Sequence, residues 1–264
     1  MYLGGTYLVG YAAGASSLGQ LASVSFGGHL LFFLVPANLL LYGLNDLFDA
    51  DTDAANPKKE DKEHRVVAEE RRIVAIGVTA CTGLLVLLIA VASSTFERFM
   101  LLAFLALSVG YSVPPLRFKA RPLLDSASNV LYALPGFLAY YQASGKMPSV
   151  NALVAAWCWT AAMHLFSAVP DIESDKRVRI TTSAVLLGWR GSLISCCVLW
   201  AVAAAALLAS GALWPWSLLG VVYPSIPLGL LFGSPSSVER VYWRFPVING
   251  VVGGIGFFLA VPKA

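Results

Sequence analysis

The chain has 264 residues, of which 58% are hydrophobic and only 12% are charged. Soluble globular proteins carry about 25% charged residues, so this composition excludes a soluble enzyme and is typical of an integral membrane protein. The net charge of +3 is ordinary and gives no indication of a nucleic-acid partner.

Long apolar runs predict an all-α, polytopic membrane protein, because a helix needs about 20 residues to cross the hydrocarbon core. One membrane domain is expected over residues 1–264, with about nine spans around a central cavity. The expected spans are residues 2–18, 25–48, 73–94, 98–113, 123–143, 149–170, 191–210, 212–232 and 245–262. Because similar acidic motifs end the second and sixth spans, two four-helix halves are expected, roughly 25–143 and 149–262.

Basic residues predict the orientation of these spans. All Lys and Arg residues except Arg98, Lys146 and Lys263 lie in or beside the loops after the second, fourth, sixth and eighth spans. The positive-inside rule makes those loops cytoplasmic. The acidic residues follow the same bias although they contribute little to topology, which indicates that the polar chemistry of a cell-membrane protein faces the cytoplasm.

The second expected span ends in a run of acidic residues. Residues 30–44 are almost purely apolar and lead directly into Asn45, Asp46, Asp49 and Asp53. Residues four apart share a helix face, so three of these residues form a stripe with Asn38 on the same side, while Asp46 is rotated toward the neighbouring face. Carboxylates this close to a bilayer core are costly and indicate a functional site.

Two hydrophilic loops follow the second and fourth spans. Residues 50–72 predict either a short surface helix over the cytoplasmic mouth or a solvated linker. After the fourth span, Pro114 and Pro115 end the helix and hold the backbone extended. Arg117 and Lys119, together with Arg65 in the first loop, can then reach a phosphate as charged donors.

A second acidic stripe ends the sixth span. Asp171 and Asp175 share one helix face with His164, which lies two turns earlier, and Glu173 lies between them. Oxygen ligands suit hard divalent cations, and Mg²⁺ in particular takes one or two carboxylates plus substrate phosphates. The alternative, a helix end with solvated acids, is less plausible for two motifs on one side of the membrane.

An anion held with magnesium at the mouth of an apolar cavity predicts a diphosphate with an apolar tail. Metal ions neutralise charge on a leaving diphosphate. Ionisation of an allylic diphosphate leaves a carbocation, which needs a dry site and aromatic faces. Tyr42, Tyr111 and Tyr132 are among the aromatic residues near the right depth.

These motifs together resemble a known family. The pattern Asn45-Asp46-x-x-Asp49-x-x-x-Asp53, the Tyr-Ser-x-Pro-Pro-x-Arg-x-Lys loop at residues 111–119, and Asp171-x-x-x-Asp175 followed by Thr181, Thr182 and Gly188 are similar to the UbiA superfamily of intramembrane prenyltransferases. The resemblance covers nearly the whole chain. It implies nine spans, two Mg²⁺ ions that bridge the acidic stripes to an isoprenyl diphosphate, and a lipophilic acceptor among the membrane lipids.

A narrower resemblance points to one branch of the superfamily. Residues 125–136 (Asp-Ser-x-Ser-Asn-x-Leu-Tyr-x-Leu-Pro-Gly) and residues 163–175 look like the lycopene elongase branch. Members of that branch add five-carbon units from dimethylallyl diphosphate to the ends of lycopene. The resemblance implies that the terminal alkene attacks the allyl cation and that the new cation loses a proton or takes up water. His164, Ser167, Asn129 or Tyr132 would take the proton or position the water.

The candidate site residues fall into three groups. The expected metal ligands are Asn45, Asp49, Asp171 and Asp175. The expected catalytic residues are Asp46, Asp53, Tyr111 and His164. The expected substrate-binding residues are Asn38, Tyr42, Arg65, Arg117, Lys119, Asn129, Tyr132 and Ser167.

Two departures from the family pattern leave alternatives open. No Lys or Arg precedes Lys58, where members usually begin with a basic segment, and Val66 follows Arg65 where many members have proline. The alternatives are a UbiA-type enzyme for another lipid acceptor (a quinone precursor, a chlorophyllide-like ring or a glycerol phosphate ether) and a terpene cyclase on the same scaffold. A membrane transporter is the rival from another class, although the acids lie at helix ends and not at the midplane.

Overall fold

The structure of the protein, a computed structural model, describes residues 2–53, 66–67, 69–211 and 214–263, with the side chains of residues 2, 49–53 and 235 left out. All regular elements in these ranges are helical. The α-helices are α1 (Tyr2–Gly14), α2 (Val24–Leu34), α3 (Pro36–Asp53), α5 (Arg71–Val91), α6 (Thr95–Ser112), α7 (Leu124–Ala127), α8 (Leu134–Ser144), α9 (Val150–Ala168), α10 (Ile172–Arg177), α11 (Ser183–Ala209), α12 (Val222–Leu230), α13 (Pro235–Tyr242) and α14 (Phe245–Ala260). Five short 3-10 segments join them, namely η1 (Leu18–Ala22), η2 (Phe118–Ala120), η3 (Ser128–Tyr132), η4 (Val169–Asp171) and η5 (Trp216–Val221).

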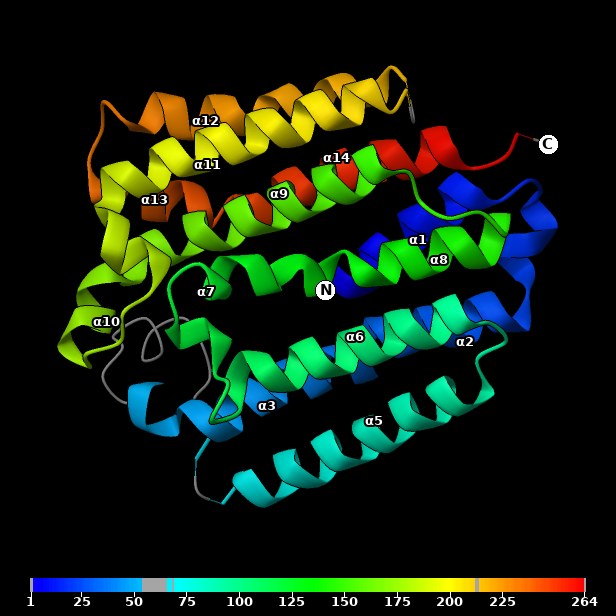
Figure 1. Cartoon of the computed structure of the whole chain (residues 1–264), viewed down its shortest axis with the longest axis horizontal. Coiled ribbons are helices and arrows are strands. Elements are labelled where there is room, and N and C mark those ends of the chain that lie inside the picture. Colours follow the sequence, from blue (N-terminus) through cyan, green and yellow to red (C-terminus); the bar gives the residue numbers. More distant parts are fainter. Residues whose placement is uncertain (1, 54–65, 68, 212–213, 264) are drawn as a thin grey trace.

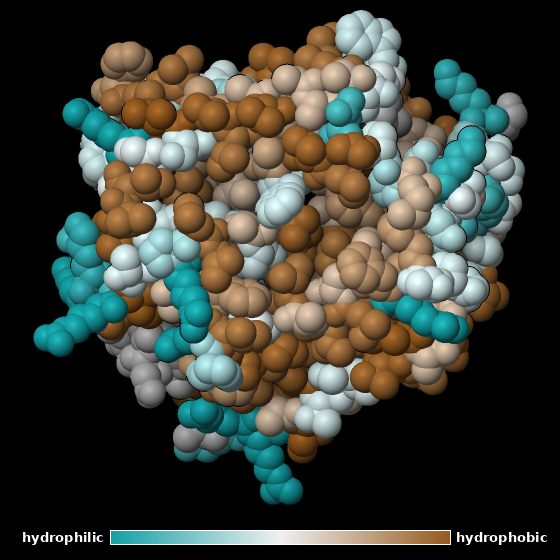
Figure 2. All heavy atoms as spheres, in the orientation of Figure 1, coloured by the Kyte–Doolittle hydropathy of each residue, from teal (hydrophilic) through white to brown (hydrophobic). Residues whose placement is uncertain are grey.

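The long helices run roughly along one direction, from α5 at one edge of the bundle to α11 and α12 at the other (Figure 1). The short helices α7 and α10 and the end of α3 gather at one end, while the C-terminus lies at the opposite end. Hydrophobic atoms cover the middle of the face seen in Figure 2, and hydrophilic atoms lie mainly toward its margins. This distribution fits a bundle that crosses a bilayer along its helices.

Four helical stretches are long and apolar enough to cross a membrane, within the part of the chain that the structure describes. They are Val24–Phe48, Arg71–Val91, Val150–Arg177 and Ser183–Ala209. A fifth is obtained if the bent pair Ser236–Tyr242 and Phe245–Ala260 forms one span. The all-helical membrane fold is therefore confirmed, whereas the expected count of nine spans is not.

Several expected spans are interrupted by breaks that hydropathy does not reveal. At Val35, directly before Pro36, the backbone leaves helical geometry (φ −124°, ψ −67°), because proline disfavours the α region for the residue before it. The expected span 123–143 consists of α7, η3 and α8. The expected span 191–210 lies after a break in α11 at Gly188 (φ 68°, ψ 171°), and a short helical segment precedes that break. This segment begins at Ser183, where the Thr182 side chain accepts a hydrogen bond from the Val185 N–H and caps the helix.

Two hydrophobic clusters form the core. The first joins α1, α2, α3, α5, α6 and α8 and contains Phe33 and Phe104, whose rings meet edge to face with centroids 5.7 Å apart. The second joins the helices from α9 to α14 around Phe166, Trp200 and Phe245. Phe166 and Phe245 have ring centroids 4.9 Å apart. The expected relationship between halves 25–143 and 149–262 stays a prediction.

Helices α1 and α8 cross at their glycines. A Cβ atom built on Gly10 would lie 2.2 Å from the carbonyl oxygen of Gly136, and one built on Gly136 would lie 3.0 Å from the carbonyl oxygen of Thr6. Because both contacts are with backbone atoms, no side chain can move aside to relieve them. The close approach of α1 to α8 therefore depends on glycine at these positions.

We expect Gly10→Ala to destabilise the protein, because the added methyl group overpacks the α1–α8 crossing at a cost of about 1–3 kcal/mol. Thermal unfolding in detergent measures the effect. Gly27→Ala is the matched control, since a Cβ atom there meets nothing within 4 Å and alanine is the better helix former. Equal unfolding temperatures for Gly10→Ala and the wild type would contradict the crossing.

Candidate active site

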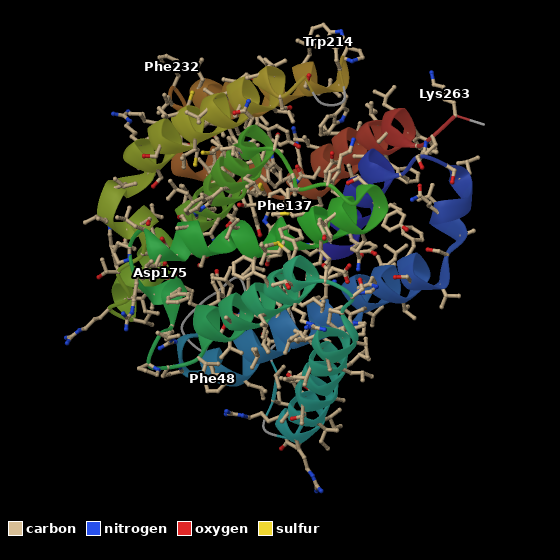
Figure 3. The ribbon with its side chains drawn as sticks, turned by 45° about the vertical axis from the view of Figure 1, so that its right-hand side comes forward. Phe48, Phe137, Asp175, Trp214, Phe232 and Lys263 are labelled. Atoms are coloured by element: carbon tan, nitrogen blue, oxygen red, sulfur yellow. The ribbon has the colours of Figure 1, made fainter. Side chains whose placement is uncertain are left out.

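A cavity of about 1740 Å³ lies between the two hydrophobic clusters and is lined by residues of both. Its polar end is formed by side chains from α3, the α6–α7 connection and the α9–α11 connection. In Figure 3, Asp175 marks this end of the molecule, Phe137 of α8 lies near the middle, and Trp214 and Lys263 lie toward the other end. The rest of the lining is mostly glycine, alanine and aromatic side chains.

Asn45 and Lys119 meet at the polar end of the cavity. The Lys119 ammonium donates to Asn45 Oδ1 at 2.8 Å and lies 3.5 Å from Ser112 Oγ, which itself donates to Asn45 Oδ1 at 3.3 Å. The chain reaches this position through a turn at Arg117, which has left-handed backbone angles (φ 38°, ψ 58°). The basic loop therefore folds back against α3 at Asn45.

Asp171 and Asp175 enter the cavity from the opposite side. Pro170 lies in η4, where α9 ends, and Asp171 precedes the first turn of α10. Asp175 Oδ2 accepts a hydrogen bond from Thr182 Oγ1 at 3.2 Å. The same hydroxyl oxygen accepts from the Val185 N–H at 3.3 Å. The position of Asp175 is therefore tied to the N-terminus of α11.

The two expected metal-binding motifs thus line one end of a single cavity, on different helices. Asn45, Asp46, Asp171 and Asp175 all line it, and all are oxygen donors, which is the ligand type that Mg²⁺ prefers. Within the residues whose side chains are described, no three His, Cys, Asp or Glu side chains lie close enough to form a metal cluster. Asp49 and Asp53 were expected in this stripe, and their side chains lie outside the described residues.

A ring of aromatic and hydroxyl groups lies next along the cavity. Tyr111 and His164 pack edge to face, with the Tyr111 hydroxyl 3.5 Å from His164 Nδ1. The Tyr132 hydroxyl donates to the Tyr42 hydroxyl at 3.4 Å. Ser167 Oγ donates to the His164 carbonyl oxygen at 2.7 Å. These side chains form the transition from the charged end to the apolar body of the cavity.

Most of the expected site residues are brought together. Those that line the cavity are Tyr42, Asn45, Asp46, Tyr111, Arg117, Lys119, Asn129, Tyr132, His164, Ser167, Asp171 and Asp175. Asn38 does not: its side-chain amide donates to the carbonyl oxygens of Phe33 and Leu34, at 2.8 and 3.1 Å, and so satisfies the end of α2 at the break before α3. Arg65 lies outside the described residues.

Asp125 lies behind the polar end of the cavity, and no role was assigned to it from the sequence. Its side chain is fully buried, and its two carboxylate oxygens accept from the hydroxyl and the backbone N–H of Ser183, at 2.5 and 2.6 Å. Ser183 Oγ in turn accepts from the Leu123 N–H at 2.7 Å. Asp125 thereby joins the loop that carries Lys119 to the helix start that holds Asp175. Its partner lies 58 residues further along the chain, so that spacing alone could not reveal the pair.

We expect Asp125→Ala to lower stability and to weaken diphosphate binding, because it leaves the N–H and hydroxyl of Ser183 buried without their acceptor. Hydrogen bonds to charged groups contribute about 1.5–3 kcal/mol each. Thermal unfolding, with and without dimethylallyl diphosphate and Mg²⁺, measures both effects.

Glu173→Ala is the control for this measurement, since Glu173 is 77% exposed and pairs at 3.0 Å with the exposed Lys176. Such surface pairs contribute little. An Asp125→Ala protein as stable and as responsive to ligand as the Glu173→Ala protein would refute the anchoring role.

Comparisons with known proteins agree with this geometry. The model of the UbiA prenyltransferase family matches residues 3–243. The lycopene elongase/hydratase of Haloferax volcanii is 46% identical over 253 residues, covering 96% of this chain and 82% of that protein. The lycopene elongase/hydratase of Haloarcula japonica is 41% identical over 261 residues, covering 99% and 87%.

Solved structures show the same fold. A UbiA homolog from Archaeoglobus fulgidus bound to DMAPP and Mg²⁺ superposes with a TM-score of 0.69 at 22% identity, covering 98% of this chain and 94% of that one. The apo structure of a UbiA homolog from Aeropyrum pernix gives a TM-score of 0.73 at 16% identity, covering 98% and 96%. The chain thus belongs to the UbiA prenyltransferase family and is an integral-membrane prenyltransferase.

Proposed function

We propose that this prenyltransferase moves a dimethylallyl group from its diphosphate to the terminal alkene of lycopene, in carotenoid biosynthesis. The observation that carries the proposal is the meeting of Asn45 and Lys119 with Asp171 and Asp175 at one end of a long apolar cavity. That arrangement suits a charged diphosphate at the end and apolar substrates beyond it. The lycopene elongase/hydratase activity of relatives that match nearly the whole chain supports lycopene as the acceptor.

The diphosphate is expected at the polar end. Arg117 and Lys119 are its proposed charged hydrogen-bond donors. Asn45, Asp46, Asp171 and Asp175 are the proposed ligands of Mg²⁺, and we expect two ions, with Asp49 as a further ligand on sequence grounds. Mg²⁺ would neutralise the negative charge that develops on the departing diphosphate. The Mg²⁺ in the Archaeoglobus fulgidus homolog supports this assignment.

The transfer forms one carbon–carbon bond. The C–O bond of the donor breaks and its electron pair leaves with the diphosphate, so that an allylic cation remains. The π electrons of the acceptor alkene then form the new bond to that cation, and a tertiary cation results on the acceptor. Tyr42, Tyr111 and Tyr132 line the cavity next to the polar end and would stabilise these cations through their ring faces.

The last step removes the charge from the acceptor. His164 lies against Tyr111, with Ser167 one turn further along α9. His164, Ser167, Asn129 and Tyr132 are our candidates to accept the proton or to hold the water that adds to the cation. The relatives are called elongase/hydratases, which supports the addition of water. We expect the polar end to face the cytoplasm of the cell membrane, since most Lys and Arg residues lie in the loops on that side.

We expect Asp175→Ala to lower the rate of transfer by at least roughly 100-fold. Removal of one preorganised group that stabilises developing charge has an effect of this size in other enzymes. Product formation by the purified protein, with donor, lycopene and Mg²⁺, measures it. Glu173→Ala on the same short helix is the control, because Glu173 pairs with the exposed Lys176 and does not line the cavity. Full activity in a folded Asp175→Ala protein would remove Asp175 from the metal site.

We expect a lycopene-producing bacterial host that expresses this chain to accumulate new pigments. Their masses should exceed that of lycopene by one or two five-carbon units, with or without water, and mass spectrometry of pigment extracts reads them directly. The Asp175→Ala protein in the same host controls for background. Unchanged lycopene beside well-expressed wild-type protein would overturn lycopene as the acceptor and leave prenyl transfer to another lipid.

A further inference from the structure

The cavity is far longer than a five-carbon donor requires. Its volume of about 1740 Å³ exceeds the roughly 300–1,000 Å³ of ordinary small-molecule sites. It follows one face of α9 from Ser149, directly before the helix, to Ser167 near its end. The 19 residues of α9 rise about 28 Å, close to the ~30 Å of a hydrocarbon core.

The part of the cavity away from Asp175 can be located from the contacts of α14. Trp216 Nε1 donates to the Val252 carbonyl oxygen at 2.7 Å. Trp216 begins η5, two residues after Trp214, which Figure 3 labels toward the end opposite Asp175. Gly253 and Gly254 follow Val252 and line the cavity, and Cβ atoms built on them meet nothing within 4 Å. The cavity is therefore open at this depth.

The distal part of the cavity is lined mainly by apolar side chains, and the hydroxyl groups among them bond to the protein itself. The Thr160 hydroxyl donates to the Ala156 carbonyl oxygen of its own helix at 2.9 Å. The Ser210 hydroxyl donates to the Leu207 carbonyl oxygen at 2.6 Å. These hydroxyl protons are thus bound within the protein. Asn249 of α14 also lines the cavity: it accepts from the Tyr223 hydroxyl at 2.9 Å, and its buried Nδ2 has no hydrogen-bond partner among the described residues.

We propose that this distal part of the cavity, between α1, α9, α11 and α14, is an acceptor channel that holds an extended acyclic polyene across the bilayer. The inference rests on the proposed function and adds the orientation of the acceptor. One terminal alkene lies among Tyr42, Tyr111 and His164, and the far half of the chain lies between Ala152 and Gly253. An extended chain of eight isoprene units is at least as long as the ~30 Å hydrocarbon core. The channel follows α9 over about 28 Å and therefore accommodates most of the length of such a chain.

The test compares a long and a short acceptor in each of several variants. Gly253→Phe fills open space in the distal channel, and Gly83→Phe is its matched control, because a Cβ atom at Gly83 on α5 also meets nothing within 4 Å and Gly83 does not line the cavity. Each protein, in lipid nanodiscs with dimethylallyl diphosphate and Mg²⁺, is given lycopene or a half-length acyclic polyene with the same terminal unit.

We expect Gly253→Phe to lower the ratio of kcat/KM for lycopene to kcat/KM for the half-length polyene by roughly tenfold or more. Gly83→Phe should leave that ratio within about twofold of the wild type. Ala152→Leu, which narrows the channel from the α9 side, should lower the ratio as Gly253→Phe does and serves if Gly253→Phe does not fold.

The outcomes separate the channel from the function on which it rests. An active wild type whose ratio is unchanged by both distal variants would overturn the channel. A changed preference for donor length, measured with geranyl against dimethylallyl diphosphate, would assign the distal part to the donor and would also overturn it. A wild type that extends neither acceptor would overturn the proposed function, and the acceptor channel with it.

Discussion

The buried carboxylate of Asp125 is the interaction on which the geometry of the polar end depends. A charged group in a membrane bundle is stable only where hydrogen bonds replace its water, and Asp125 has the N–H and hydroxyl of Ser183 for this purpose. These bonds join the loop that carries Lys119 to the N-terminus of α11, which holds Asp175. Because Thr182 both caps α11 and bonds Asp175, one helix start fixes the position of a charge in the cavity.

The charged residues could be predicted from the sequence because hydrocarbon makes them conspicuous. Asp46, Asp171 and Asp175 end long apolar runs, and such acids indicate function by their cost alone. The same reasoning was less informative for Asn38, which follows the helical spacing of the acidic stripe but bonds the carbonyl oxygens freed at the break between α2 and α3. A polar residue near a proline has a local use that helical periodicity does not reveal.

The helix boundaries show the limit of hydropathy in another way. An apolar run predicts that a segment is buried in lipid or protein, but it is silent on where the backbone hydrogen bonds are interrupted. Residues 123–143 are apolar enough to suggest one span and instead form three short pieces. The interruption has a function in the fold, because Asp125 and Asn129 bond backbone groups there and bring Tyr132 against Tyr42. The contact between Tyr132 and Tyr42 joins residues 90 positions apart in the chain, so no local pattern contains it.

The charged residues that line the cavity lie at one of its ends, and this affects how an acceptor with two identical ends is extended. Both ends of an acyclic polyene are chemically alike, but in the proposed channel only one of them lies beside the diphosphate at any time. The other end lies between Ala152 and Gly253, where wall hydroxyls bond to carbonyl oxygens of their own helices and, among the described residues, no charged side chain lines the cavity. Addition at the second end therefore requires the polyene to leave the channel and to return reversed. Because the channel holds the two ends of the polyene at opposite ends of the helices, the two additions are separate binding events.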